Sequence, residues 1–205
     1  MVKNAAVAPK RTRVNGADRR ELILKAARKV FIESGFSGAR TNRIAELAGT
    51  SEAMLYRHFS SKEELFESAI LEPVEKLVSE LTESAGSMAS LSDRDSRREA
   101  SYEVNADVLA QMREVAPLLG VALFSDRAAG AKFYKKRLEP LLHGLSDSLA
   151  SALEGWPHRP VTPELIIAMQ LGTYNWIAMN EYFGSRKPDG DAISQQLTDL
   201  LVRAL

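Results

Sequence analysis

The chain has 205 residues, 45% of them hydrophobic, enough for one large domain or for a small head on a larger body. It has no cysteine, which excludes disulfides and cysteine-ligated zinc. The formal net charge of +0 conceals an asymmetry, because residues 1–62 hold 13 Lys and Arg against 5 Asp and Glu, a net of +8, and the remainder carries −8. A basic head on an acidic body indicates a polyanionic partner at one end only.

Targeting and membrane signals are missing from the sequence. No apolar run follows the first basic residues, and the longest apolar stretch, residues 165–179, is interrupted by Gln170 and Asn175. We therefore expect a cytoplasmic protein with no membrane contact.

Residues 1–17 show no periodicity and predict a flexible basic arm. A helix is expected from Asp18, with Glu21 at the capping-box position, and an apolar stripe at helical spacing runs along it. Gly35 is expected to end this helix as a left-handed cap.

Two short helices and a long one are expected next. Thr41 is the N-cap candidate of the first, which ends at Gly49, and Ser51 is that of the second. Ser61 begins the longer helix, and Pro73 is expected to bend it.

The remainder also reads as helical. Its Ser, Asp and Gly content predicts a loop over residues 86–96, and its prolines predict a break over residues 155–163 that ends at an N-cap on Thr162. The expected helices span residues 97–115, a short segment after Pro117, 129–153, 163–182 and 191–204. No segment has strand periodicity, so the predicted fold class is all-α.

The segment Thr41–Phe66, TNRIAELAGTSEAMLYRHFSSKEELF, carries the functional signal. Its two short helices are too short to be stable alone and need the first helix as a lid. Such a three-helix, helix-turn-helix unit lets the second short helix enter a DNA major groove.

This segment closely resembles the head of the TetR family of transcriptional regulators, through the TNRIAELAG helix, the SEAMLYRHF recognition helix and the SKEELF start of the next helix. The resemblance covers Asp18–Phe66. It implies a helix-turn-helix DNA-binding domain over residues 18–62 and a helical effector-binding and dimerisation domain over residues 63–205. It also implies a repressor that a small-molecule effector releases from a palindromic operator on double-stranded DNA.

The resemblance places nine residues at the DNA, and the alternatives for two of them stay open. These residues are Thr41, Arg43, Ser51, Ala53, Met54, Tyr56, Arg57, His58 and Lys62. Tyr56 either touches DNA or packs against the first helix. Arg57 either makes a bidentate hydrogen bond to guanine O6 and N7, or it is solvated or binds a phosphate.

Some features of the head either depart from the family pattern or extend beyond it. Glu52 stands where lysine is frequent, and Met54 replaces a small polar residue. In the arm, Lys10, Arg11 and Arg13 either enter the minor groove or stay solvated.

Residues 163–182 are apolar nearly all round, which gives that helix two packing partners. One is its own core. The other is expected to be the same helix of a second subunit, joined by residues 191–204 in a homodimer, as the resemblance also implies. The alternative is a monomer that buries the helix on all sides. Two heads about 34–36 Å apart would read a palindrome.

The resemblance further implies an effector pocket between the body helices. Candidates to line it are Asn105, Met112, Phe124, Tyr134, Tyr174, Trp176 and Met179, and plain core packing is the alternative for each. Asn105 is an amide on an apolar stripe; burying it costs free energy unless it has a hydrogen-bond partner, which a ligand could supply. Effector binding would shift the population of head spacings through the helix that holds Pro73.

Two rival classes were weighed. An enzyme finds no support, because the chain has no G-x-S-x-G, no phosphate-binding glycine loop and no H-E-x-x-H, and neither a metal nor another cofactor is expected. The second rival is a helical interaction protein of the same fold that does not bind DNA specifically.

Overall fold

The computed structural model describes residues 15–91, 93–154, 160–185 and 188–204, and over these ranges it is helical without a strand. The all-α prediction is confirmed. The elements in order are α1 (Gly16–Gly38), α2 (Thr41–Leu47), α3 (Glu52–His58), α4 (Lys62–Ala89), α5 (Arg94–Phe124), α6 (Arg127–Phe133), the π-helical turn η1 (Tyr134–Leu138), α7 (Glu139–Glu154), α8 (Pro163–Phe183) and α9 (Gly190–Ala204). The arm predicted over residues 1–17 lies mostly outside the described residues.

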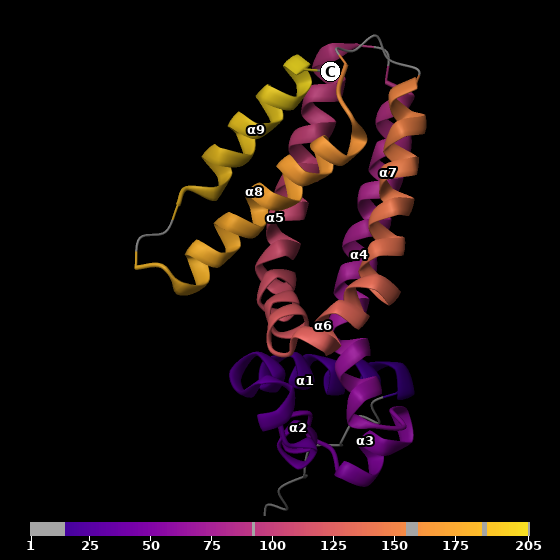
Figure 1. Ribbon diagram of the computed structural model, residues 1–205, viewed down its shortest axis with the longest axis vertical. Helices are drawn as coiled ribbons and strands as arrows, with labels where there is room; N and C mark the ends of the chain where they lie inside the picture. The colour runs from indigo at the N-terminus through magenta and orange to yellow at the C-terminus, as the bar shows by residue number, and fades with distance from the viewer. Residues whose placement is uncertain (1–14, 92, 155–159, 186–187, 205) are drawn as a thin grey trace, which may run out of the picture.

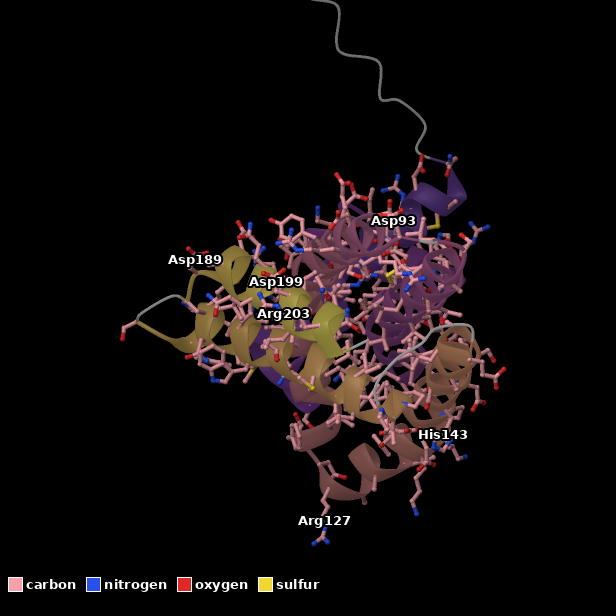
Figure 2. All side chains as sticks on the ribbon, turned by 90° about the horizontal axis from the view of Figure 1, so that it is seen from above. Asp93, Arg127, His143, Asp189, Asp199 and Arg203 are labelled. Atoms are coloured by element: carbon pink, nitrogen blue, oxygen red, sulfur yellow. The ribbon has the colours of Figure 1, made fainter. Side chains whose placement is uncertain are left out.

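The helices form a small head under a long body. In Figure 1, α1, α2 and α3 gather at one end of the molecule, and α4, α5 and α7 run lengthwise away from them. Helices α8 and α9 cross one side of the body, and α6 lies just above α1. Seen from the body end in Figure 2, Asp199 and Arg203 of α9 lie away from His143 of α7.

The head has its own hydrophobic core. The stripe predicted on the first helix is buried, with Ile23, Ala27 and Phe31 fully enclosed. It packs against Ile44, Leu55 and neighbouring apolar residues of α2 and α3. Leu65 and Ala69 of α4 belong to the same core, so the head core extends past the boundary predicted at residue 62.

The ends of α1 and α2 differ from the prediction. Helix α1 begins at Gly16, earlier than the expected Asp18, because the Asn15 side chain accepts a hydrogen bond from Asp18 N (2.8 Å). Gly35 has a φ of +64°, and the helix kinks there and continues to Gly38. Thr41 is not an N-cap: it is the first residue of α2, and the cap position holds Arg40 without a side-chain hydrogen bond.

The loop predicted over residues 86–96 is shorter than expected, because α4 extends to Ala89 and α5 already begins at Arg94. Helix α4 continues to Ala89, and within it Ser87 Oγ donates to Glu83 O (3.0 Å), so the serine hydroxyl has a partner inside the helix. Helix α5 begins early because the Asp93 side chain accepts from Ser96 N (2.8 Å).

The prolines predicted to bend or divide helices lie inside continuous ones. Helix α4 runs through Pro73 without interruption, and α5 runs through Pro117 to Phe124, so the separate short helix expected after Pro117 does not exist. A buried stripe on both sides of Pro117, including Val115 and Leu118, packs into the body core and favours the continuous helix over its division.

Helices α6 to α7 form one consecutive helical stretch where a helix over residues 129–153 was predicted. Asp126 caps it, accepting from Ala129 N (2.8 Å). Within it, Glu139 N bonds to Tyr134 O in the π-helical register of η1. The N-cap predicted at Thr162 is confirmed, because its side chain accepts from Leu165 N (3.3 Å). Of the break predicted over residues 155–163, residues 155–159 lie outside the described residues.

The close approach of α6 to α5 requires glycine at position 130. A Cβ there would lie 2.2 Å from the backbone oxygen of Leu123, whereas a Cβ on Gly144 in α7 would meet no atom within 4 Å. We expect Gly130→Ala to lower the free energy of unfolding by about 1 to 3 kcal/mol through overpacking. Gly144→Ala is expected to raise it by about 1 kcal/mol through helix propensity.

Urea unfolding at one fixed protein concentration measures both changes, since association also affects apparent stability. Equal effects of the two substitutions would contradict the close packing of α6 on α5.

Candidate nucleic-acid interface

Helix α3 separates an inward apolar side from an outward polar side. Leu55 and the following Phe59 are 0% and 1% exposed and belong to the head core. Tyr56 and Arg57 point outward and are exposed. The predicted cap is confirmed, because Ser51 Oγ accepts from Met54 N (3.2 Å). The helix therefore presents its polar side to solvent at the free end of the head.

A tight turn sets the angle between α2 and α3. Gly49 has a φ of +65°, a conformation that favours glycine. Arg19 of α1 donates from Nη1 to Gly49 O (3.2 Å) and so ties this turn to the first helix. The sequence prediction missed Arg19, because its acceptor is a backbone oxygen 30 positions away that no local pattern marks.

A polar network joins the start of α2 to α3. Thr41 Oγ1 donates to the Glu52 carboxylate, and Tyr56 OH donates to Thr41 Oγ1 (3.4 Å). Tyr56 is 44% exposed, so it does not pack as a core aromatic against the first helix. Glu52, considered only as a departure from the family pattern, holds Thr41 and through it Tyr56 in position.

Two basic residues flank α3 with weak restraints. Arg43 of α2 pairs with Glu33 of α1 (2.8 Å) with both side chains more than a third exposed. Such an exposed ion pair contributes little to stability, so Arg43 can readily exchange Glu33 for another anion. Lys62, at the start of α4, places Nζ 4.7 Å from the centroid of the Phe36 ring. Both cations therefore remain available to a ligand.

The N-terminus of α4 is fixed by its own caps. Ser61 Oγ accepts from Glu64 N (3.0 Å), and the Glu64 carboxylate accepts from Ser60 N (2.6 Å). The hydrogen bonds from the Ser60 hydroxyl and amide lower the pKa of Glu64 below its ordinary value. These bonds hold Lys62 in place beside α3.

The structure brings the nine predicted DNA-contacting residues to one end of the head. They lie on α2, on α3 with its cap, and at the start of α4 (Figure 1). Arg43, Ser51, Ala53, Tyr56 and Arg57 are exposed, and Thr41, Met54, His58 and Lys62 are half-buried. They form a single surface, which we call the α3 surface.

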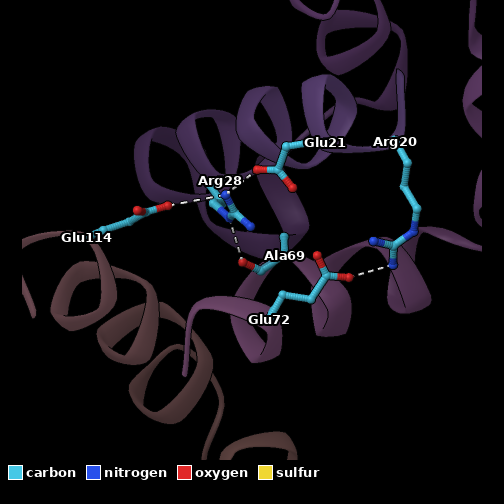
Figure 3. Close-up of polar contacts among 6 residues, drawn as sticks. All are labelled: Arg20, Glu21, Arg28, Ala69, Glu72 and Glu114. Carbon is cyan, nitrogen blue, oxygen red and sulfur yellow. Dashed lines mark hydrogen bonds and ion pairs between the residues drawn. The ribbon is translucent and has the colours of Figure 1, made fainter. Parts of the chain in front are cut away.

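Arg28 joins the head to the body. Figure 3 shows its guanidinium between three elements: Nε donates to Ala69 O of α4 (3.1 Å), and Nη1 contacts Glu21 of α1 (3.1 Å) and Glu114 of α5 (3.3 Å). Its side chain is 13% exposed. A cation this enclosed requires such partners.

Arg20 provides a second tie on the same helix. It pairs with Glu72 of α4 (2.5 Å) in Figure 3, and its guanidinium carbon lies 5.1 Å from the centroid of the Phe59 ring. The hydrogen bond to Glu72 raises the pKa of Arg20. Together these contacts fix α1 against α4 and against the segment that follows α3.

The body encloses a small, mainly apolar space, which we call the body cavity. It has a volume of about 70 Å³. Its lining comes from five helices, α4, α5, α7, α8 and α9, and includes Leu81, Ala85, Val104, Asn105, Leu149, Ala152, Ile166, Gln170 and Leu201.

The Asn105 amide, for which a ligand was one expected partner, has protein partners in the structure. Asn105 is 1% exposed, its Nδ2 donates to Thr198 Oγ1 of α9 (2.7 Å), and its Oδ1 accepts from Gln170 of α8 (2.5 Å). Asn105 therefore lines the cavity as part of a satisfied polar network that joins α5, α8 and α9.

The structure does not bring the other six effector candidates to this cavity. Met112 and Tyr174 lie in the body core, where burial raises the pKa of Tyr174 to about 12. Phe124 and Tyr134 are exposed near the head. Trp176 and Met179 lie on the outer side of α8.

That outer side forms a continuous apolar stripe, which we call the α8 face. Its large exposed side chains are Leu165, Met169, Trp176, Met179, Tyr182 and Phe183. Trp176 is 55% exposed. Gly172 lies within the stripe and leaves a hollow, since no atom lies within 4 Å of the place its Cβ would occupy. Leu200 of α9 is also exposed.

The described residues show neither a membrane-spanning helix nor a metal-binding cluster. In these ranges no helix combines the length and apolar character needed to cross a membrane. The same ranges contain no grouping of three or more His, Asp or Glu side chains that could hold a metal ion.

Comparison with known proteins centres on the head. Residues 23–69 match the model of the family described as bacterial regulatory proteins, tetR family. The HTH-type transcriptional repressor NicS of Pseudomonas putida is 49% identical over 59 residues, 28% of this chain and 28% of NicS. The HTH-type transcriptional regulator RutR of Escherichia coli is 28% identical over 164 residues, 78% of this chain and 73% of RutR.

Comparison with solved structures extends the likeness to the whole fold. The fatty acid degradation regulator FadR from Bacillus halodurans superposes with a TM-score of 0.64 at 22% identity, covering 90% of this chain and 94% of FadR. At that identity the likeness concerns the fold alone. The head therefore matches the family model of bacterial regulatory proteins, tetR family, over residues 23–69, and the chain as a whole shares its fold with a solved bacterial regulator.

Proposed function

We propose that this protein is a transcriptional repressor that binds a palindromic operator as a homodimer and is released by a small-molecule effector. The observation that carries the proposal is the α3 surface, where exposed Tyr56 and Arg57 project from a short helix whose other side is locked into the head core. The repressor output is inferred from the likeness of the head to NicS, a transcriptional repressor. A regulator of this kind acts in the cytoplasm, where the bacterial chromosome lies.

The chemistry of the α3 surface fits duplex DNA. Arg57, unencumbered on the outward side of α3, has the donors to bond guanine O6 and N7 in the major groove. Arg43 and Lys62 flank it and would neutralise phosphates on either side. The Glu52 carboxylate accepts a hydrogen bond from Thr41, and this bond would reduce its repulsion of the DNA phosphates.

The α8 face supports a homodimer. An exposed apolar stripe of this length along one helix is the mark of an interface rather than of scattered surface hydrophobics. The hollow at Gly172 would let two copies of α8 approach closely, and Leu200 of α9 would complete a four-helix contact. Two α3 helices would then read two half-sites.

The body cavity supports an apolar effector with one hydrogen-bonding group. Its lining is largely aliphatic, and Asn105 and Gln170 supply the polar atoms. At about 70 Å³ it is far smaller than the roughly 300–1,000 Å³ of ordinary ligand pockets. Binding would therefore select a more open arrangement of the body helices, and this difference between states is what a population shift requires.

Two substitutions on the α3 surface separate base reading from phosphate binding. We expect Arg57→Ala to weaken binding to the preferred operator by about 1 to 3 kcal/mol and to relax sequence preference at one position of each half-site. Lys62→Ala is expected to weaken binding to all duplexes and to lower the salt dependence by about one phosphate contact per subunit.

Selection from a random duplex pool, followed by titration at several salt concentrations, measures both effects. Lys76→Ala, which removes an exposed cation from the body, serves as the matched control and should change neither quantity. A wild-type chain that selects no sequence would support the rival interaction protein, and a reporter gene that falls when the protein is removed would contradict repression.

A charge on the α8 face should prevent dimerisation. Trp176→Asp is expected to weaken self-association by at least about 2 kcal/mol, as for an aromatic anchor at the centre of an interface. Light scattering over a protein dilution series measures the effect, and circular dichroism checks that the helices persist. Phe124→Asp makes the same change at an exposed aromatic away from the face and should leave the dimer intact. A dimeric Trp176→Asp variant would contradict the assignment.

Filling the body cavity should abolish the effector response. We expect straight-chain alcohols to raise the melting temperature of the wild type and to release it from its operator, and Ala152→Leu to remove both responses. Ala150→Leu adds the same atoms on α7 at a position that does not line the cavity, so it should respond as the wild type does. Release that survives Ala152→Leu would place the effector elsewhere.

A further inference from the structure

A second hollow, which we call the junction cleft, lies between the head and the body. One wall is the end of α1, residues 34–37, with the first turns of α4, and the other is the end of α5 with α6 and η1. Its volume is about 900 Å³, within the roughly 300–1,000 Å³ of small-molecule sites. It shares no lining residue with the body cavity.

The floor of the junction cleft is aromatic. Phe36 of α1 and Phe66 of α4 meet edge to face with ring centroids 5.0 Å apart, and both remain half-buried. Phe133 of α6 and Ala122 of α5 complete the apolar lining. Rings left partly open at the bottom of a cleft offer apolar area to a ligand with an aromatic or alkyl body.

The α6 side of the cleft carries two free cations. Lys132 and Lys136 both line it, four positions apart, and neither forms an ion pair with any residue that the structure describes. The neighbouring charges have partners, since Arg137 pairs with Glu67 (3.0 Å) and the Asp126 carboxylate caps α6. Glu63 faces them from the α4 wall.

This wall also contains η1, where the backbone follows π-helical hydrogen bonding. Such turns are rare and are frequently kept at functional sites. Lys136 lies within η1 and Lys132 in the last turn of α6, so the irregular turn is part of the surface that carries the free cations. The geometry and the charge therefore point to the same wall.

We propose that the junction cleft binds an organic carboxylate with an aromatic or alkyl body. The carboxylate would accept hydrogen bonds from Lys132 and Lys136, and the apolar part would lie against Phe36 and Phe66. A ligand held in this way contacts α1 and α6 at once, so it favours the head orientation in which both walls fit it. This site is independent of the body cavity and of the effector proposed for it.

Calorimetric titration of the full chain with 2-naphthoate tests the proposal. We expect one saturable site per chain, and much weaker binding of the uncharged 2-naphthamide. Lys132→Gln and Lys136→Gln should each weaken 2-naphthoate binding about tenfold, the effect of one lost charge-assisted hydrogen bond. Lys135→Gln removes an adjacent exposed cation of η1 that does not line the cleft and should bind as the wild type does.

Two further variants locate the bound probe without relying on charge. Ala129→Trp fills the cleft from its exposed α6 side and should abolish binding, whereas Ala152→Leu fills the body cavity and should leave it unchanged. The proposal is overturned if 2-naphthamide binds as tightly as 2-naphthoate, if Lys135→Gln weakens binding as much as Lys132→Gln, or if only Ala152→Leu prevents it. None of these readouts involves DNA, so they stand apart from the test of repression.

Discussion

The enclosed guanidinium of Arg28 is the constraint on which the placement of the head depends. Its three acceptors come from three different helices, α1, α4 and α5, and one of them is the backbone oxygen of Ala69. Removing any partner of a partly buried cation destabilises the folded protein, because the charge is left without compensation. The head therefore cannot turn on the body without exchanging these bonds, and Arg20, paired with Glu72, resists the same rotation.

The same helices extend this constraint to the DNA-facing end. Helix α4 begins with Lys62 on the α3 surface, accepts the bond from Arg28 one third of the way along, and reaches the body cavity at Leu81. Because α4 is continuous through Pro73, a displacement near the cavity would, on the proposed effector mechanism, pass along a single helix to the head. The cap at Ser61 and the tie from Arg19 to Gly49 keep the α3 surface fixed relative to the start of that element.

Sequence reasoning succeeded where the signal is local and failed where partners are distant. The caps at Ser51 and Thr162 were found because the capped amide lies three residues away. The partners of Asn105 could not be predicted, because Gln170 and Thr198 lie 65 and 93 positions away in the sequence. The serine content of residues 86–96 predicts a longer loop than the structure has, because composition does not show that the Ser87 hydroxyl bonds to Glu83 O inside α4. The predicted pocket included Trp176 and Met179 because the apolar character of a side chain does not show whether it lies on the inner or the outer side of a helix.

On the proposed effector mechanism, the small body cavity requires the body helices to move, and the contacts of Arg28 indicate which one at the junction breaks first. A cavity of about 70 Å³ between α4, α5 and the helices around them has no room for a sizeable molecule until those helices move apart. Of the three contacts of Arg28, the one to Glu114 of α5 is the longest (3.3 Å), and the Glu114 side chain is 54% exposed. Movement of α5 away from α1 would break that contact before the bond to Ala69, because water can replace an exposed carboxylate but not a backbone oxygen inside the junction. The head would then stay attached to α4 and turn with it, which changes the spacing of two α3 helices in a dimer without unfolding either head.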